Sequence, residues 1–254
     1  MELDWEAREG VPLLVARAGG ARIAFTTRQG GVSDGSFASL NLGFATADSA
    51  AAVAENRRRA LAAAGARAEC AVSLRQRHGS AVVEARPPAA GSYLDAATSW
   101  AEGDALVTAE PGLPLIAHGA DCLTVALVAQ NGSRLAVVHA GWRGLVAGVL
   151  EAAAERVGPD FAAVIGPGAG ACCYEVGDEV AAPLRARFGD DVVAGRHADL
   201  ATGARRALEG AGAAEVAAAG LCTICHPARF HSYRRDGAGS GRQAVIAYLE
   251  DGSG

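Results

Sequence analysis

The stretch that decides the fold reads LTVALVA-QNGS-RLAVVH and spans residues 123–139. In it, two apolar runs flank Asn131-Gly132, and an Asn-Gly pair in that setting is a strong signal for a β-hairpin. If these two are the turn residues, His139 lies opposite Thr124. Cys122 then shares a face with Thr124 and becomes a diagonal neighbour of His139, about 7–8 Å away at the backbone.

The same region suggests a metal centre built from His78, Cys122 and His139. Alternation over 71–78 predicts a strand that ends at His78, beside a glycine. Two imidazoles and one thiolate are the ligand set of a catalytic zinc site with an open fourth position. A lone buried cysteine is more often a core residue, so the prediction depends on the three side chains converging. Asp121 is expected to orient a ligand histidine or to act as acid or base, or else to be a turn residue.

The rest of the chain alternates between strand and helix signals. Strands are predicted over 21–27, 81–85, 104–108, 162–165, 216–221 and 243–249, and helices over 145–157, 178–188 and 199–210. Another helix is expected to begin at an Asp48 cap and to end at Gly65, and 87–99 is expected to be a loop. Strand pairs mixed with helices favour an α/β or α+β fold with mixed sheets.

Composition excludes several classes of function. Half of the 254 residues are hydrophobic, 20% are charged, and the formal net charge is −5, so binding of a nucleic-acid polymer is not expected. The first residues are acidic and lack the apolar core of a signal peptide, and no apolar run reaches a membrane span. We therefore expect a cytoplasmic protein whose six cysteines are thiols or metal ligands rather than disulfides.

Other cysteines and histidines allow more than one interpretation. The run 222–226, CTICH, matches a haem-attachment pattern, but without a secretory signal or an evident second axial ligand we expect structural thiols, with a redox or metal pair as the alternative. Cys172 and Cys173 are expected to be packing residues. His118 is a spare metal ligand or, more simply, a polar residue with its hydrogen bonds satisfied. Arg28 and Arg143, which lie beside glycine-rich turns, are candidates for binding an anion.

The ordered motifs resemble the YfiH-like laccase-domain family. They are FTTR at 25–28 with GGVS at 30–33, SLNLG at 39–43, ENR at 55–57, His78-Gly79, Asp121-Cys122, HAGWRG at 139–144, IGP at 165–167, YEVG at 174–177 and SYRR at 232–235. The resemblance covers nearly the whole chain, which is treated as one domain, 1–254. It departs from the family at Thr124, where proline is common, and at His118-Gly119-Ala120, where Thr-Ala is usual.

The resemblance implies a layered α/β/β/α fold with mixed sheets, similar to a cysteine-hydrolase-like toxin domain. It also implies a zinc-dependent purine nucleoside phosphorylase that acts on adenosine, inosine, guanosine and methylthioadenosine, with phosphate as co-substrate and with adenosine deaminase activity. The zinc ligands would be His78, Cys122 and His139. Catalytic roles would fall to Asp121, Cys122 and Arg28, and substrate-binding roles to Arg28, Asn41, Arg143, Tyr233 and Arg234. Nucleoside and phosphate would be the partners of a monomer or small homo-oligomer.

Three alternatives remain open from the sequence. The first is a copper-dependent polyphenol oxidase, although six histidines are few for a multicopper site. The second is a hydrolase that edits a peptidoglycan precursor, with Cys122 as nucleophile and a histidine as base. The third is a binding or scaffold protein with a purely structural zinc ion, for which His118 or a further cysteine would be the fourth ligand.

Overall fold

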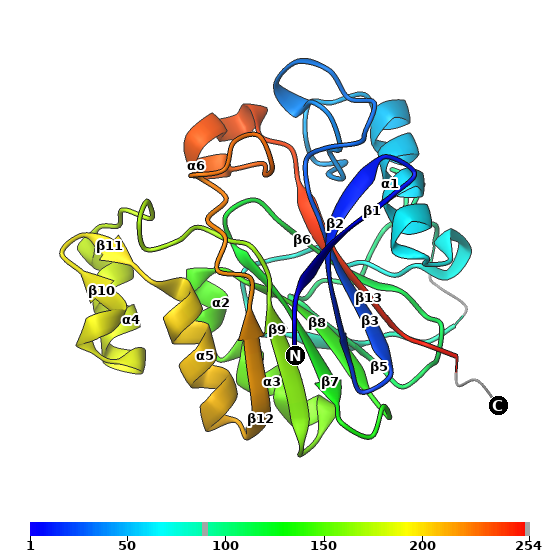
Figure 1. Cartoon of the computed structure of the whole chain (residues 1–254). Coiled ribbons are helices and arrows are strands. Elements are labelled where there is room, and N and C mark those ends of the chain that lie inside the picture. The colour runs from blue at the N-terminus through cyan, green and yellow to red at the C-terminus, as the bar shows by residue number, and fades with distance from the viewer. Residues whose placement is uncertain (88–90, 252–254) are drawn as a thin grey trace.

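The computed structural model describes residues 1–87 and 91–251 and contains two large sheets packed face to face, an antiparallel sheet of five strands and a mixed sheet of six (Figure 1). The five-stranded sheet has the order β1-β2-β3-β13-β6, and the six-stranded sheet has the order β12-β9-β7-β8-β5-β4. The strands are β1 Asp4–Arg8, β2 Val11–Ala18, β3 Ala21–Thr26, β4 Val82–Glu84, β5 Ala105–Thr108, β6 Leu115–Gly119, β7 Leu123–Ala129, β8 Leu135–Ala140, β9 Phe161–Ile165, β12 Ala213–Ala218 and β13 Gln243–Leu249, and a small pair joins β10 Val193–Ala194 to β11 His197–Ala198.

The predicted hairpin is the centre of the six-stranded sheet. β7 and β8 pair antiparallel, and Thr124 lies opposite His139, so the predicted register is confirmed. The connection is wider than a two-residue turn: Ala129 still donates a backbone hydrogen bond to Arg134, and Gly132 alone takes a left-handed φ of 69°. The register is unchanged because widening the loop from two to four residues removes one residue from the end of each strand.

Alternation along this hairpin separates two cores. Odd-numbered residues of β7, such as Val125 and Leu127, belong to a core shared with the helices. Even-numbered residues, such as Ala126 and Val128, belong to the core between the two sheets. His139 belongs to the β8 residues that face the other sheet, and it lies where β8 runs out of that core. A polar side chain at this edge can therefore reach a space between the sheet ends.

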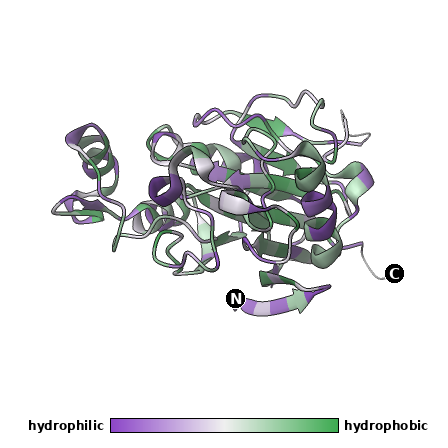
Figure 2. Cartoon of the chain, turned by 90° about the horizontal axis from the view of Figure 1, so that it is seen from above, coloured by the Kyte–Doolittle hydropathy of each residue, from purple (hydrophilic) through white to green (hydrophobic). Residues whose placement is uncertain are grey.

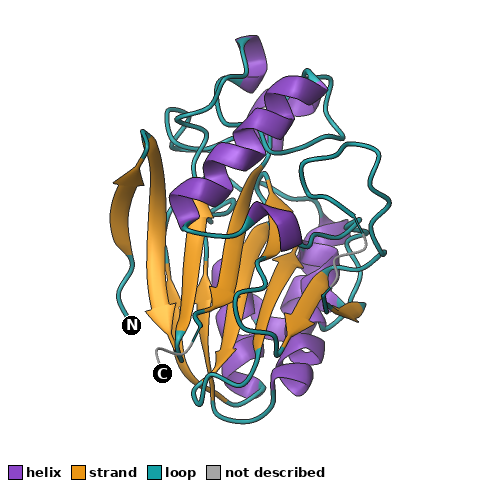
Figure 3. Cartoon of the chain, turned by 90° about the vertical axis from the view of Figure 1, so that its right-hand side faces the viewer, coloured by secondary structure: helices purple, strands orange, loops and turns teal. Residues whose placement is uncertain are grey.

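Helices cover both outer faces of the sheet pair, as Figure 3 shows from the side. Helix α1, Ala50–Ala64, packs on the five-stranded sheet in a third core. Helices α3 Val149–Val157, α4 Asp178–Phe188 and α5 Leu200–Gly210 contribute to the core on the six-stranded sheet. Figure 2 shows hydrophobic residues concentrated in the central strands and hydrophilic ones in the peripheral helices and loops. The order helix, sheet, sheet, helix confirms the predicted α/β/β/α layering.

The remaining helical segments are short. They are α2 Trp142–Val146, α6 Tyr233–Asp236 and the 3-10 turns η1 Gly35–Phe37, η2 Ala68–Cys70, η3 Asp190–Val192 and η4 Gly237–Gly239. Within the described residues, no helix combines the length and apolar character needed to cross a membrane.

Several local predictions need correction. The segment 71–78 forms only isolated bridges and no continuous ladder: Val72 pairs with Leu115 of the edge strand β6, and Arg75 pairs with Glu102, which lies outside the strands. The helix predicted over 145–157 is two helices, since Gly148 adopts a left-handed φ of 84° between them. Ser49, rather than Asp48, is the N-cap of α1, whereas the predicted end at Gly65 is confirmed.

Other strand boundaries also differ from the predictions. β12 begins and ends three residues before the predicted 216–221, and β1, β2 and β6 were not predicted. β12 is an edge strand with mostly half-exposed residues, so its apolar pattern is weak. Part of the loop predicted over 87–99, residues 88–90, lies outside the described residues.

Candidate functional site

His78, Cys122 and His139 converge at one end of the sheet pair. Their potential ligand atoms all lie within 4.8 Å of one another. The two imidazole rings meet edge to face, with centroids 4.8 Å apart and an interplanar angle of 79°. His139 is buried and His78 is exposed, so the cluster has a protein side and an open side. The sequence prediction that these three side chains would approach one another is therefore met in the structure.

Two elements bring the ligands together. Cys122 immediately precedes β7 and His139 lies near the end of β8, so the hairpin register places them diagonally across the ladder. His78 comes from the irregular segment beside the sheet and adopts a left-handed φ of 61°. This backbone conformation is unusual for a residue with a side chain and is typical of functional sites.

Asp104, at the start of β5, holds both histidines in place. Its carboxylate accepts a hydrogen bond from His139 Nδ1 at 2.8 Å. The same carboxylate accepts backbone N–H bonds from His78 at 2.9 Å, Gly79 at 2.7 Å and Arg77 at 3.1 Å. Because Nδ1 is occupied, Nε2 of His139 is the nitrogen that can ligate a metal, as in carboxylate–histidine–metal arrangements.

Sequence reasoning missed Asp104 and assigned its role to Asp121. The available signal was an acidic residue, Asp104, directly before a buried strand; its link to His139 is visible only through the pairing of β5 with β8. The carboxylate of Asp121 instead accepts hydrogen bonds from Thr223 Oγ1 at 2.7 Å and from the Arg234 backbone at 2.6 Å. Asp121 thus does not orient a ligand histidine, and it ties the chain before Cys122 to the loop of Thr223 and to helix α6.

Burial and hydrogen bonds shift the pKa values of Cys122, His139 and Asp104. Burial raises the pKa of Cys122, but hydrogen bonds from His139 and His78 outweigh it and lower that pKa to about 6. Burial lowers the pKa of His139, but its bonds to Asp104 and Cys122 raise it to about 9. The carboxyl pKa of Asp104 is lowered by the bonds it accepts, although burial opposes this. A thiolate and an imidazolium are therefore the stable forms near neutral pH.

The glycine in position 141 is required by the close packing of the cluster. A Cβ at Gly141 would lie 2.9 Å from Cys122 Sγ and 3.2 Å from a ring carbon of His78. Similarly, a Cβ at Gly144 would lie 3.1 Å from the carbonyl oxygen of Gly79. The HAGWRG motif therefore supplies the ligand His139 and two closely packed glycines. Gly141 lies against the other two ligands, and Gly144 lies against Gly79, the neighbour of His78.

The donor set fits a metal ion. Three ligands of nitrogen and sulfur, separations that one ion can bridge, and a carboxylate behind one histidine are the features of a catalytic zinc-type site. Among the described residues, the cluster has no fourth ligand, which disfavours a purely structural ion here. His118, the candidate for that position, instead shares a 2.8 Å hydrogen bond with Tyr93 through Nε2.

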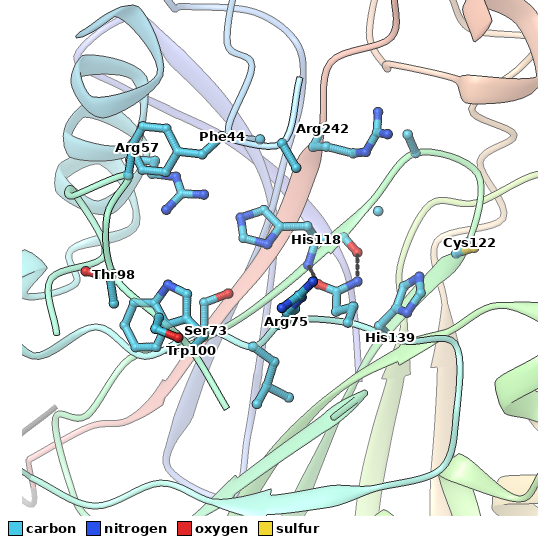
Figure 4. A pocket seen from close by; sticks show the side chains of 18 of the residues that line it. Phe44, Arg57, Ser73, Arg75, Thr98, Trp100, His118, Cys122, His139 and Arg242 are labelled. Atoms are coloured by element: carbon cyan, nitrogen blue, oxygen red, sulfur yellow. Dashed lines mark hydrogen bonds between the residues drawn. The ribbon is translucent and has the colours of Figure 1, made fainter. Parts of the chain in front are cut away.

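The open side of the cluster faces a cavity of about 910 Å³ (Figure 4). This is large enough for a nucleoside-sized ligand. The three cluster residues line it together with aromatic, cationic and polar side chains, notably Phe44, Trp100, Tyr233, Arg57, Arg75, Arg242, Ser73, Gln76, Thr98 and His118. In the view of Figure 4, Arg57 and Phe44 lie on one side of His118, and Cys122 and His139 lie on the other.

Two cations of the cavity wall have no acidic partner. Arg57 is 5% exposed, and its guanidinium lies 4.0 Å from the ring centroids of both Phe44 and Tyr93. Arg242 is largely buried and donates to the carbonyl oxygens of Ser240 and Gly241. Among the described residues, no carboxylate forms a salt bridge with either arginine, whereas Arg75 pairs with Glu102. A buried cation without a counter-ion favours the binding of an anion.

Tyr233 is the one predicted substrate-binding residue that lines the cavity, where it is 55% exposed. The others lie elsewhere. Arg28 donates to the backbone carbonyls of Ser36, Ala38 and Pro227, Asn41 is fully buried, Arg143 is exposed over the ring of Trp142, and Arg234 donates to the carbonyl of Glu175.

Asn41 influences the cavity indirectly. Its side-chain oxygen accepts backbone hydrogen bonds at 2.9 Å from Gly43 and from Arg242, both of which line the cavity. The arginines predicted to bind an anion or substrate, Arg28, Arg143 and Arg234, thus do not line the cavity, whereas Arg57 and Arg242 do. The sequence signal for Arg57 is its position in the ENR motif, in the middle of an alanine-rich helix. A cation on the packed face of such a helix is costly to bury unless it has a partner.

Comparison with known proteins places the chain in a family. Residues 22–250 match the family model described as multi-copper polyphenol oxidoreductase laccase. The chain belongs to this family. The match begins within β3, after β1 and β2, and it covers the six-stranded sheet and every residue that lines the cavity, so the metal-compatible cluster lies within the matched region.

Relatives and solved structures agree over nearly the full length. A purine nucleoside phosphorylase of Pseudomonas aeruginosa is 40% identical over 242 residues, which are 91% of this chain and 94% of that protein. A purine nucleoside phosphorylase of Deinococcus radiodurans is 40% identical over 250 residues, 94% of each chain. The crystal structure of YlmD from Geobacillus stearothermophilus has a TM-score of 0.88 at 31% identity, covering 98% of this chain and 99% of that one. The predicted fold and the predicted family are both confirmed.

Proposed function

We propose that this protein is a metal-dependent purine nucleoside phosphorylase. The observation that carries the proposal is a three-ligand centre that opens into a cavity of about 910 Å³, whose wall holds the buried Arg57 and the partly buried Arg242, neither of which forms a salt bridge among the described residues. Relatives that are 40% identical over more than nine-tenths of the chain bear the name purine nucleoside phosphorylase, which supports it. We further propose that residues 1–254 act as one domain.

In the proposed reaction, a phosphate oxygen attacks C1′ of the ribose and the C1′–N9 bond breaks. The electron pair of that bond leaves with the purine, which takes up a proton, and ribose 1-phosphate is the other product. Arg57 and Arg242 are the residues we assign to phosphate, because charge-assisted hydrogen bonds would neutralise both them and the anion. Phe44 and Trp100 offer aromatic faces for the purine, and Tyr233 lies at the exposed rim.

His78, Cys122 and His139 would hold the metal, and we propose zinc. When bound, zinc supplies a Lewis acid that polarises a substrate oxygen or a water molecule. Cys122 contributes as a ligand in this proposal, and Asp104 keeps His139 in the tautomer that can bind. Asp121 and Arg28, for which catalytic roles were predicted, would act by positioning the loops around the cavity.

Adenosine, inosine, guanosine and methylthioadenosine form the proposed substrate range, and deamination of adenosine is a proposed second activity. Both would use the same cavity. Deamination replaces the amino group at purine C6 by an oxygen from water, so it needs the open side of the metal centre but no phosphate.

The direct test is an assay of the zinc-loaded protein with adenosine, with and without phosphate. Adenine and ribose 1-phosphate are expected with phosphate, and inosine is expected in either case. Arg242→Gln should raise the KM for phosphate about 10-fold or more, because it removes a charge-assisted bond, while Arg143→Gln serves as a matched surface control. Absence of all three products, with Cys122→Ala indistinguishable from wild type, would refute the proposal.

One observation favours a second candidate, a thiol-dependent hydrolase. Cys122, His139 and Asp104 form a chain of hydrogen-bonded groups in the order thiol, imidazole and carboxylate, which is the arrangement of cysteine hydrolases. This candidate requires a free thiolate, so zinc would inhibit it. A peptidoglycan-precursor analogue hydrolysed faster after chelation, with a Cys122 adduct detected by mass spectrometry, would establish it over the phosphorylase.

Copper-dependent phenol oxidation is the activity suggested by the family description. Of the six histidines, only His78 and His139 belong to a metal-compatible cluster among the described residues. A multicopper site needs many more imidazole ligands. Metal analysis of protein purified without added copper, together with a phenol-oxidation assay, tests this activity directly.

A further inference from the structure

Four cysteines form a second cluster, separate from the cavity. The sulfur atoms of Cys172, Cys173, Cys222 and Cys225 all lie within 4.8 Å of one another. Cys225 Sγ is 3.2 Å from Cys172 Sγ and 2.9 Å from Cys173 Sγ. None of the four lines the cavity, and Cys172 and Cys225 are exposed. The expectation that Cys172 is a packing residue is therefore wrong.

The topology explains why two distant pairs meet. β9 and β12 are parallel neighbours, so the loops after them leave the same edge of the sheet. Pairing continues beyond the strands at an isolated bridge between Gly168 and Cys222. The cysteine pair two to three residues after Gly170 thereby reaches the pair in the second loop.

The environment of the cluster resembles that of a metal-bound thiolate. Gly170 donates its backbone N–H to Cys222 Sγ at 3.3 Å, and the amides of Ile224 and Cys225 also point at this sulfur. Hydrogen bonds from backbone amides to a cysteine sulfur stabilise its thiolate form, which is the form that binds a metal. Four sulfurs around an ion with bonds of about 2.3 Å would be about 3.8 Å apart, which falls within the spread of the cluster.

We infer that Cys172, Cys173, Cys222 and Cys225 bind a zinc ion in a closed, all-thiolate site. Four protein ligands leave no open position, so this ion has a structural role. It joins the loop after β9 to the loop after β12. Thr223 of the second loop donates to Asp121, the neighbour of Cys122, so the ion fixes a loop that supports the metal centre of the cavity.

The site is tested first by metal content. Protein purified without chelator and equilibrated with zinc should contain two zinc ions per chain, as should Cys70→Ser, a matched control in neither cluster. The double variant Cys172→Ser/Cys225→Ser should contain one. The double variant His78→Ala/His139→Ala should also contain one, held by the cysteines. Equal zinc content in wild type and in the cysteine variant would overturn the inference, and so would iron in place of zinc.

A second measurement uses the wild-type chain and does not depend on the folding of a variant. Alkylation mapped by mass spectrometry should show that zinc protects all four cysteines and that a chelator exposes them, while Cys70 reacts equally in both conditions. In the cobalt-substituted protein, Cys172→Ser/Cys225→Ser should lose roughly four-fifths of the thiolate charge-transfer absorption, because four of the five ligating sulfurs lie in this cluster. Protection of Cys122 alone, or disulfides in protein purified without air, would contradict the site. These readouts are independent of phosphorylase activity.

Discussion

Two groups of possible metal ligands differ in number, type and surroundings: the centre formed by His78, Cys122 and His139, and the four-cysteine cluster. A hydrogen bond from Thr223 to Asp121 connects the segments that carry Cys122 and Cys222. The first has mixed ligands, one open side and a buried carboxylate behind a histidine. The second has four sulfurs, backbone amide donors and no cavity. Ligand number separates the proposed roles, because an ion with an open position can meet a substrate and a fully ligated ion cannot.

The largest expected contrast is in catalysis. Cys122→Ala or His139→Ala should lower kcat/KM for nucleoside phosphorolysis by about 100-fold or more, because the ligand set for the metal is broken. Cys172→Ser/Cys225→Ser, compared with Cys70→Ser, should change kcat/KM far less, since its ion has no access to the cavity. Product formation at saturating zinc measures both. Equal losses in the two variants would remove the distinction between a catalytic and a structural site.

Asp104→Asn should have the next largest effect. The amide cannot stabilise charge on His139 as the carboxylate does, so zinc affinity and activity should fall about 10–100-fold. Zinc titration with a competing chelator, together with kcat/KM, measures this. Asp160→Asn is the matched control, because Asp160 is exposed and its φ of 55° suits asparagine. Unchanged zinc affinity in Asp104→Asn would show that the carboxylate only shapes the backbone at 77–79.

Gly141→Ala tests the packing around His78 and Cys122. The new methyl group would lie 2.9 Å from Cys122 Sγ, and overpacking of this kind costs about 1–3 kcal/mol of the free energy of unfolding. We expect lower zinc affinity in the cavity with the four-cysteine site still filled. The control is Gly210→Ala, where a Cβ meets no atom within 4 Å. Thermal unfolding and zinc content are the measurements, and wild-type values in both would contradict the close approach.

The smallest expected effect concerns the pH dependence of the Cys122 thiol. In chelated protein, alkylation of Cys122 should rise as pH increases through about 6, because the pKa is lowered by His139 and His78 and the thiolate is the reactive form. Zinc should suppress the reaction. Quantitative mass spectrometry over a pH series, with Cys70 as the internal comparison, checks this. A midpoint above 8 would show that the imidazolium partner is absent.

Much of the fold could be predicted from local sequence. The β7–β8 register followed from Asn131-Gly132 between two apolar runs, and α4 and β13 were predicted with their observed boundaries, α4 even though Pro183 lies inside it. Predictions failed where tertiary contacts replace local preference. The segment 71–78 alternates like a strand but forms only isolated bridges to Leu115 and Glu102, and β12 is a half-exposed edge strand with a weak pattern.

The sequence by itself determined the ligand types, the hairpin that places Cys122 beside His139, and the family motifs. The tertiary structure alone decided that Asp104 supports His139, that Arg57 and Arg242 rather than Arg28 line the cavity, and that four cysteines meet. The physical reason is how far apart in the sequence the contacting residues lie. Hairpin register is set by neighbouring residues. The Asp104–His139 contact, between residues 35 apart, depends on β5 pairing with β8, and the contact of Gly170 with Cys222, between residues 52 apart, depends on β9 lying parallel to β12.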